Sequence, residues 1–195
     1  MTADNNHLKA VTMMQRMRCT PLGAPLVALI IIASWSVPAA AAGTQEGVKL
    51  AGRYGYVGGD GDVKALYSSV EGVVKKMNWA IRGIARRRLR KPNMPTAEIS
   101  IAVDATTITV SRIGHSTVAT PLSGAPVTWR SPDGTFQVTQ VIEGRTLLQT
   151  LKGKDSQSTN AYTLGADGVT LSVHTDIVSR RLPAPVEFVM SYRKK

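Results

Sequence analysis

The sequence predicts a mainly β protein of the α+β class, in which an N-terminal amphipathic helix precedes an antiparallel up-and-down barrel, or a strongly curved sheet, of eight or nine strands. Apolar residues recur every three or four positions over 63–94 and every second position after Pro95. Short turns between the alternating stretches force neighbouring strands to run antiparallel. The 195 residues suit a single domain, and 43% hydrophobic content is enough for a core.

Residues 1–42 have the layout of a secretory signal peptide. Residues 19–45 carry no charge and contain the apolar run 26–33, cations come before that run, and a string of alanines follows it. We expect cleavage after Ala42, because Ala40 and Ala42 are the small residues that a signal peptidase accepts. The protein is therefore expected to be periplasmic or secreted.

Two alternatives stay open for this segment. If translation starts at Met13 or Met14 rather than at Met1, the charged part before the apolar run has an ordinary length. An uncleaved membrane anchor over 19–42 is long enough to cross a bilayer, but three prolines interrupt its helix near both ends. We favour cleavage, which removes three cations and one acid, lowers the formal charge from +11 to +9 and leaves no cysteine.

Residues 43–62 form a glycine-rich lead-in, and residues 63–94 form a basic amphipathic helical segment. Gly72 and Gly83 are places where this segment can divide into two shorter helices. Its apolar stripe has to be buried, most economically against the mouth of the barrel or the inner face of the sheet.

Residues 95–195 form the barrel. Turn sequences such as Asp-Gly at 133–134 and 167–168 separate the short stretches of alternating polarity. The expected strands lie near 98–104, 107–111, 116–120, 127–129, 136–139, 147–151, 158–165, 169–177 and 186–192, and the pattern is weakest at 116–120 and 158–165.

The chain shows no catalytic motif, no metal site and no cofactor motif, so we predict that it is not an enzyme. One cysteine and three histidines are too few for a zinc finger or a disulfide framework. The glycines at 58–61 lack the Gly-Lys-Ser/Thr of a phosphate-binding loop. His174 and Asp176 share one face of a strand, but without a nucleophile motif they are more simply a solvent-facing polar pair.

A basic run is the most unusual feature of the sequence, because eight cations and no acid fall within residues 75–91. It can be a solvated helix face, with cations suited to the helix C-terminus. It can also bind anionic lipid headgroups, with Trp79, Ile81 and Ile84 inserting into the interface. Nucleic acid is an unlikely partner of an exported chain that has no aromatic-rich stacking surface. The cations are Lys75, Lys76, Arg82, Arg86, Arg87, Arg88, Arg90 and Lys91.

The interior of the barrel is the second candidate site. The inward phase of the strands mixes Val and Ile with Thr and Gln149, a composition that fits a ligand cavity and equally fits an interior filled by the helix. The apolar contacts of a ligand are expected from Trp129, Phe136, Phe188 and Tyr192, and Arg130 or Arg193 is expected to meet an anionic end.

The C-terminal half resembles a lipocalin- or calycin-type barrel, because repeated Asp-Gly hairpins lead to a last strand ending Ser191-Tyr192-Arg193. The fatty-acid-binding branch of that group also ends on a strand with Tyr and Arg, which there bind a carboxylate. Here Tyr192 and Arg193 are adjacent and point to opposite faces, so only one of them can line a pocket. The Gly-x-Trp motif of true lipocalins is absent.

The chain from residue 43 onward also resembles a group of secreted bacterial proteins without an established activity. This resemblance bears on fold and compartment rather than on chemistry. The segments that carry it are Tyr56–Asp60, Met77-Asn78, Arg82–Leu89, Asp167-Gly168 and Arg181–Pro185.

The sequence therefore predicts a periplasmic or secreted, non-enzymatic binding protein for a small apolar or amphipathic ligand. The alternative is a cell-envelope interaction protein that binds anionic lipid or a protein partner through the basic helical segment. Salt distinguishes the two, because electrostatic surface binding weakens with ionic strength and apolar binding in a pocket does not.

Overall fold

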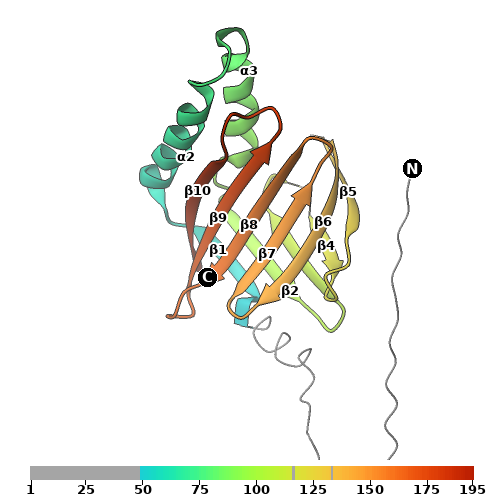
Figure 1. Ribbon diagram of the computed structural model, residues 1–195. Helices are drawn as coiled ribbons and strands as arrows, with labels where there is room; N and C mark the ends of the chain where they lie inside the picture. The colour runs from blue at the N-terminus through green and yellow to red at the C-terminus, as the bar shows by residue number, and fades with distance from the viewer. Residues whose placement is uncertain (1–48, 116, 133) are drawn as a thin grey trace, which may run out of the picture. The chain divides into compact units, whose positions relative to one another are not determined.

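The computed structural model describes residues 49–115, 117–132 and 134–195, which form ten strands and two α-helices (Figure 1). The expected mainly β fold is confirmed, with ten strands rather than eight or nine. The strands are β1 (Gly52–Tyr56), β2 (Glu98–Val103), β3 (Thr107–Arg112), β4 (Val118–Pro121), β5 (Val127–Ser131), β6 (Gly134–Glu143), β7 (Thr146–Lys152), β8 (Ser156–Leu164), β9 (Thr170–Ser179) and β10 (Val186–Lys194). The helices are α2 (Gly59–Val74) and α3 (Trp79–Arg90), and a short 3-10 helix, η1 (Lys91–Asn93), follows α3.

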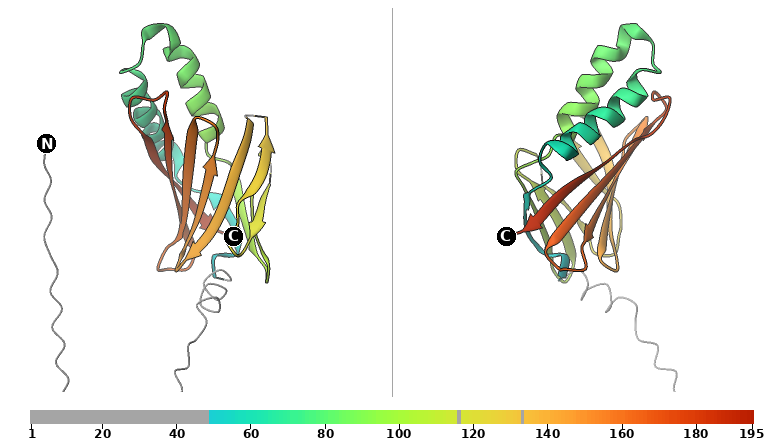
Figure 2. Two further views of the ribbon diagram at one scale, coloured as in Figure 1. Left: turned by 45° about the vertical axis from the view of Figure 1, so that its right-hand side comes forward. Right: turned by 90° about the vertical axis from the view of Figure 1, so that its left-hand side faces the viewer.

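All ten strands belong to one antiparallel sheet, in the order β4-β3-β2-β1-β10-β9-β8-β7-β6-β5. Pairing of β1 with β10 joins the first strand to the last. The sheet curls so that its two edges, β4 and β5, come towards each other (Figure 2). Thr120 of β4 donates a hydrogen bond to Gln140 of β6 at 3.1 Å across this seam. In the described part of the chain no backbone ladder joins β4 to β5, so the barrel is nearly closed.

The additional strand, β1, lies in the lead-in over 43–62, where only a glycine-rich loop was expected. Its five residues place a single large side chain, Tyr54, in the core, where it is fully buried. The Tyr54 hydroxyl donates to the carbonyl of Leu50 at 2.6 Å. With two glycines in five residues, β1 has too little side-chain alternation to be recognised from sequence.

Helix α2 lies along an open edge of β10 (Figure 1). Strand β1 pairs with β10 only from Tyr192 to Lys194, so the preceding part of β10 lacks a strand neighbour on that side. Two side chains of α2 accept hydrogen bonds from this edge: Ser69 from the Glu187 amide at 3.0 Å and Asp62 from the Ser191 amide at 2.6 Å. The apolar stripe of α2 is buried in the same core as the strands and consists of Leu66, Val70, Val73 and Val74.

Helix α3 is attached mainly to α2, and none of its residues is buried. Glu71 of α2 accepts two hydrogen bonds from Arg86, at 2.7 and 3.0 Å, and one from Arg90 at 2.6 Å. The Arg90 guanidinium also lies 4.3 Å from the centre of the Tyr67 ring. The hydrogen bonds from Arg86, together with the nearby positive charges, lower the pKa of Glu71.

The helical segment divides at 75–78, and not at Gly72 or Gly83, which lie inside α2 and α3. The reason is a cap: the side chain of Asn78 accepts a hydrogen bond from the Ala80 amide at 3.0 Å and begins the second helix. Arg82 then donates to the carbonyls of Met77 and Lys75, in the connection that follows α2, at 3.0 and 2.8 Å. These contacts hold the two helices as a hairpin.

The predicted signal peptide, its cleavage after Ala42 and the anchor over 19–42 lie outside the described residues. Among the described residues, no helix has the length and apolar content needed to cross a bilayer.

We predict that Glu71→Gln loosens α3 from α2 without unfolding the barrel. The variant removes the charge that holds two arginines, so amide protection factors of α3 should fall about fivefold while those of β8–β10 stay unchanged. Glu143→Gln, at an exposed position of β6, is the matched control. Hydrogen exchange measured by mass spectrometry reads both regions in one experiment.

The same contact should respond to acid. Because the folded-state pKa of Glu71 lies below its usual 4.5, its contribution is present above pH 4.5 and is lost as the pH falls through the folded value. In the unaltered protein, α3 protection corrected for intrinsic exchange should therefore fall below pH 4.5. Equal α3 protection in Glu71→Gln and the unaltered protein at pH 7 would contradict this role.

Candidate functional site

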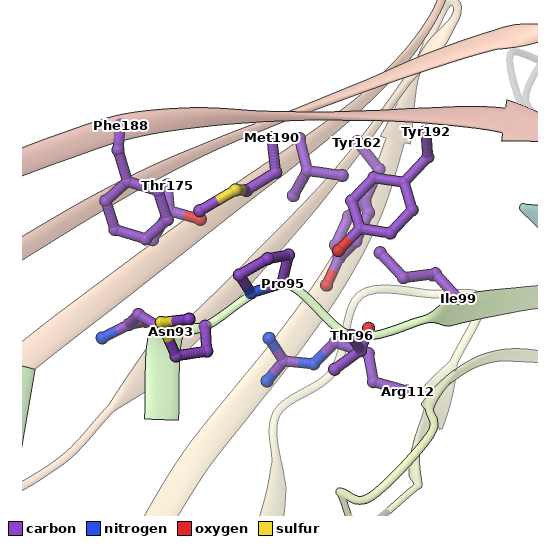
Figure 3. A pocket seen from close by; sticks show the side chains of 12 residues that line it. Asn93, Pro95, Thr96, Ile99, Arg112, Tyr162, Thr175, Phe188, Met190 and Tyr192 are labelled. Atoms are coloured by element: carbon purple, nitrogen blue, oxygen red, sulfur yellow. The ribbon is translucent and has the colours of Figure 1, made fainter. Parts of the chain in front are cut away.

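A small enclosed space of about 20 Å³ lies inside the barrel (Figure 3). One wall comes from the chain that returns from α3 into β2, over Asn93–Thr96 and Ile99. The opposite wall comes from β8, β9 and β10. Half of its lining residues are apolar, and these include Val173, Phe188 and Met190, because β9 and β10 turn every second residue inward.

The polar side chains that line this space include Arg112 of β3, Tyr162 of β8 and Tyr192 of β10, together with Asn93, Thr96 and Thr175. Figure 3 shows the two tyrosine side chains directed from one wall towards Arg112 on the other. Tyr162 is fully buried and Tyr192 is 3% exposed. A cation that faces two phenol hydroxyls inside a barrel is a chemical arrangement suited to holding an anion.

The pKa values of the two tyrosines reflect this surrounding. Burial raises the pKa of the Tyr162 hydroxyl, and the positive charge of Arg112 acts in the opposite direction. Burial also raises the pKa of Tyr192, against hydrogen bonding with Thr96 and the charge of Arg112. Both hydroxyls therefore stay protonated at neutral pH and can donate hydrogen bonds to an anionic oxygen.

Arg112 reaches the interior through the alternation of β3. Ile108 and Val110 are buried on the inner face, and Arg112 occupies the next position of the same phase, where it is half-buried. Among the described residues, no carboxylate forms an ion pair with Arg112. Partial burial removes water from the Arg112 guanidinium, and no ion pair with a described residue compensates for this lost hydration.

The structure distributes the six predicted ligand-contact residues over three places. Phe188 and Tyr192 line the enclosed space. Arg130 and Arg193 are exposed, because each lies on the outward phase of its strand, so neither faces the interior. Arg193 instead lies near Asp167, whose pKa of about 2 is set first by hydrogen bonds from Thr170 and Val169 and only then by this charge.

The remaining two residues, Trp129 and Phe136, are half-buried cross-strand partners on β5 and β6. Their ring centres are 6.0 Å apart. The Trp129 indole donates to the carbonyl of Thr117 at 3.2 Å, so this pair bridges the seam between β4 and β5 and does not line the enclosed space.

Sequence reasoning missed Arg112 and Tyr162. A signal for Arg112 was present, because an arginine that continues the apolar phase of Ile108 and Val110 has to enter the interior if the strand keeps its alternation. No comparable signal marked Tyr162, since an inward tyrosine is ordinary in a core. That the two meet depends on barrel closure, which brings β3 opposite β8.

The basic run separates into two sets. Arg82, Arg86 and Arg90, four residues apart, face α2 and make the contacts of the helical hairpin. The other five are exposed and form no ion pair within the described chain: Lys75, Lys76, Arg87, Arg88 and Lys91. Beside them Trp79 is 80% exposed, and Ile81 and Ile84 are also exposed.

His174 and Asp176, which share the outer face of β9, have exposed and half-buried side chains respectively. Within the described residues, no group of three or more His, Cys, Asp or Glu is placed to bind a metal ion.

A second, open depression lies where the β6–β7 and β8–β9 turns meet β10. Lys49, Arg145 and Lys194 border it together with Asp167. Most of these side chains are exposed to water, which screens their charges, and Arg145 is occupied by a hydrogen bond to the Gly165 carbonyl. The interior is therefore the better candidate for selective binding.

Comparison with known proteins finds distant structural likeness. No family model and no curated protein sequence matches the chain. Lipid binding protein 8 of Caenorhabditis elegans is similar over 76% of this chain and 96% of that chain, with 12% identity and a TM-score of 0.48. A Schistosoma mansoni fatty acid binding protein in complex with arachidonic acid is similar over 75% and 96%, with 14% identity and a TM-score of 0.43. Zebrafish ileal bile acid-binding protein complexed with cholic acid is similar over 75% and 99%, with 13% identity and a TM-score of 0.45.

Proposed function

We propose that this protein binds a small amphipathic molecule inside the barrel, with the anionic end of the ligand at Arg112 and its apolar part along β9 and β10. The observation that carries the proposal is the half-buried guanidinium of Arg112, which has no carboxylate partner in the described chain and faces the hydroxyls of Tyr162 and Tyr192. A carboxylate or sulfonate would supply the missing charge and accept hydrogen bonds from Arg112, from Tyr192 and, in exchange for its bond to Gln149, from Tyr162.

Binding requires the interior to open. About 20 Å³ accommodates a single water molecule, whereas pockets for small organic ligands measure roughly 300–1,000 Å³. The wall most suited to move is the segment Asn93–Thr96, because it begins at the last residue of η1, lies outside the strand ladders and connects to a helix, α3, that has no buried residue. An outward shift of α3 and this segment would enlarge the space without breaking strand pairing.

Arg112→Met should weaken binding of a long-chain fatty acid such as palmitate by about tenfold or more, because a charge-assisted hydrogen bond in a buried site is lost. Arg130→Met and Arg193→Met, which remove exposed cations of the same barrel, should leave the affinity unchanged. Isothermal titration calorimetry with palmitate, and with its uncharged methyl ester, measures the difference.

Two further measurements serve as controls for this test. Urea unfolding of Arg112→Met should show no large loss of stability, because removal of the arginine leaves no carboxylate without its ion-pair partner. The affinity for palmitate should change little between low and high salt. Equal affinity of Arg112→Met and the unaltered protein for palmitate would rule out the proposed orientation, and a failure of palmitate to bind the unaltered protein would rule out the proposed function for fatty acids.

A second function, attachment to an anionic lipid surface, is supported by the tip of the helical hairpin. There Lys75 and Lys76 directly follow α2, and Trp79 begins α3 with 80% of its surface exposed. Ile81 and Ile84 continue this exposed apolar surface beside Arg87 and Arg88. An amphipathic helix with exposed tryptophan and several free cations has the composition of an interfacial helix.

For this function we predict binding to phosphatidylglycerol vesicles and not to phosphatidylcholine vesicles in sedimentation assays. Lys75→Gln with Lys76→Gln should weaken binding about tenfold, and Trp79→Ser should weaken it further, because charge attraction and insertion act together. Arg130→Gln with Arg193→Gln is the control with the same change in charge. Binding that persists in 0.5 M salt, or is equally reduced by the control, would speak against the hairpin tip as the lipid contact.

We also propose that the protein acts in the periplasm or outside the cell as a chain beginning at Gly43. The uncharged, apolar segment before Ala42 and the small residues at the expected cleavage position support this. N-terminal sequencing of the exported protein from a bacterial host should read Gly43 first. A mature protein that keeps residues 19–42 would instead indicate the membrane anchor.

A further inference from the structure

A row of buried polar side chains crosses the interior of the barrel, beside the space around Arg112. Gln140 of β6, Gln149 of β7, Asn160 of β8 and Thr175 of β9 lie directly opposite one another from strand to strand. Their exposed fractions are 0%, 2%, 5% and 5%. Four adjacent strands therefore place an amide or hydroxyl at the same level of the core, where apolar side chains are the usual occupants.

Hydrogen bonds connect most of this row. The Thr175 hydroxyl donates to the side-chain oxygen Oδ1 of Asn160 at 2.9 Å. The side-chain nitrogen of Asn160 donates to the side-chain oxygen Oε1 of Gln149 at 3.1 Å. The Tyr162 hydroxyl donates to the same oxygen of Gln149 at 3.2 Å. Tyr162 and Thr175 also line the space around Arg112, so the row borders the anion site at this end, whereas Gln140 lies at the other end, next to Thr120 at the seam.

Gln140, at the end of the row, is incompletely paired. Its side-chain oxygen accepts a hydrogen bond from Thr120 at 3.1 Å, while its amide nitrogen, Nε2, is buried and has no hydrogen-bond partner. Exchanging the oxygen and nitrogen of this amide does not remove the deficit, because Thr120 reaches only one of the two atoms. An unpaired buried amide group destabilises a fold and is uncommon in a core.

The chemistry of the row selects the group that would complete it. No described cation lies within the row, so a second anionic group would be left without a counter-charge, and an apolar group would leave Gln140 unpaired. A hydroxyl both donates and accepts a hydrogen bond, so it satisfies Gln140 in either orientation of the amide.

We infer that the row formed by Gln140, Gln149, Asn160 and Thr175 is a second polar subsite, which takes a neutral hydroxyl on the apolar part of a ligand whose anionic end lies at Arg112. The inference rests on the proposed function and narrows it: the preferred ligand class is a hydroxylated amphipathic acid rather than a plain fatty acid. Tyr162 lies between the Arg112 site and the polar row, because it lines the space around Arg112 and donates a hydrogen bond to Gln149.

The test compares stearate with hydroxystearates whose hydroxyl lies at carbons 8 to 12. The unaltered protein should bind at least one hydroxystearate about tenfold more tightly than stearate, because a hydrogen bond to a buried, unpaired amide is gained. Gln140→Met should reduce that preference to less than about twofold, because the amide that favours the hydroxyl is removed. Gln137→Met, an exposed glutamine on the outer face of the same strand, should keep the full preference.

A second variant separates this role from a structural one. Thr120→Val with Gln140→Met replaces both partners at the seam by apolar groups of similar shape, and its melting temperature should equal or exceed that of the unaltered protein. Loss of the preference in this stable variant supports the subsite. Stearate binding without any preference, or a preference that survives Gln140→Met, overturns the inference and leaves the proposed function standing. If neither stearate nor any hydroxystearate binds, both the inference and the proposed function are overturned. If a crystal with bound hydroxystearate shows only an ordered water at Gln140, the inference alone is overturned.

Discussion

The free edge of β10 is the constraint on which the rest of the architecture depends. Strand β1 ends at Tyr56 and leaves the first part of β10 without a strand neighbour on the side opposite β9. Ser69 and Asp62 accept hydrogen bonds from that edge, and the apolar stripe of α2 closes the core behind it. Exposed strand edges are otherwise sites of aggregation, so the helix both seals and protects the barrel.

The position of α2 determines what the mouth of the barrel is made of. Because α2 is fixed to β10 and Glu71 fixes α3 to α2, the chain returns into β2 across the interior at Asn93–Thr96. This returning segment is the wall opposite Phe188 and Tyr192. Helix α3, which has no buried residue, and the segment after it thus lie where the proposed ligand would enter, and local opening there disturbs the fold least.

Charge is used in two different ways in this molecule. Arg82, Arg86 and Arg90 are internal to the helical hairpin, and the carboxylate of Glu71 serves two of them. The five remaining cations of the basic run face solvent, so its free charge is smaller than its composition indicates. Arg112 is separate from that run, and it lies half-buried inside the barrel, where low solvent content strengthens the interactions of a charge.

Local patterns in the sequence determined most of the elements. Apolar residues at every second position predict the strands after Pro95, apolar residues at every third or fourth position predict the helices, and Asp-Gly sequences predict hairpin turns. They also placed Phe188 and Tyr192 on an inward phase, whereas Arg193, which was expected to meet the anionic end of a ligand, lies on the outward phase. Tertiary structure alone decided that Arg112 faces Tyr162 and Tyr192, that Trp129 and Phe136 sit at the seam, and that four polar side chains fall in register. The physical reason is that strand register and barrel closure are set by contacts between residues far apart in the chain, which no local periodicity records.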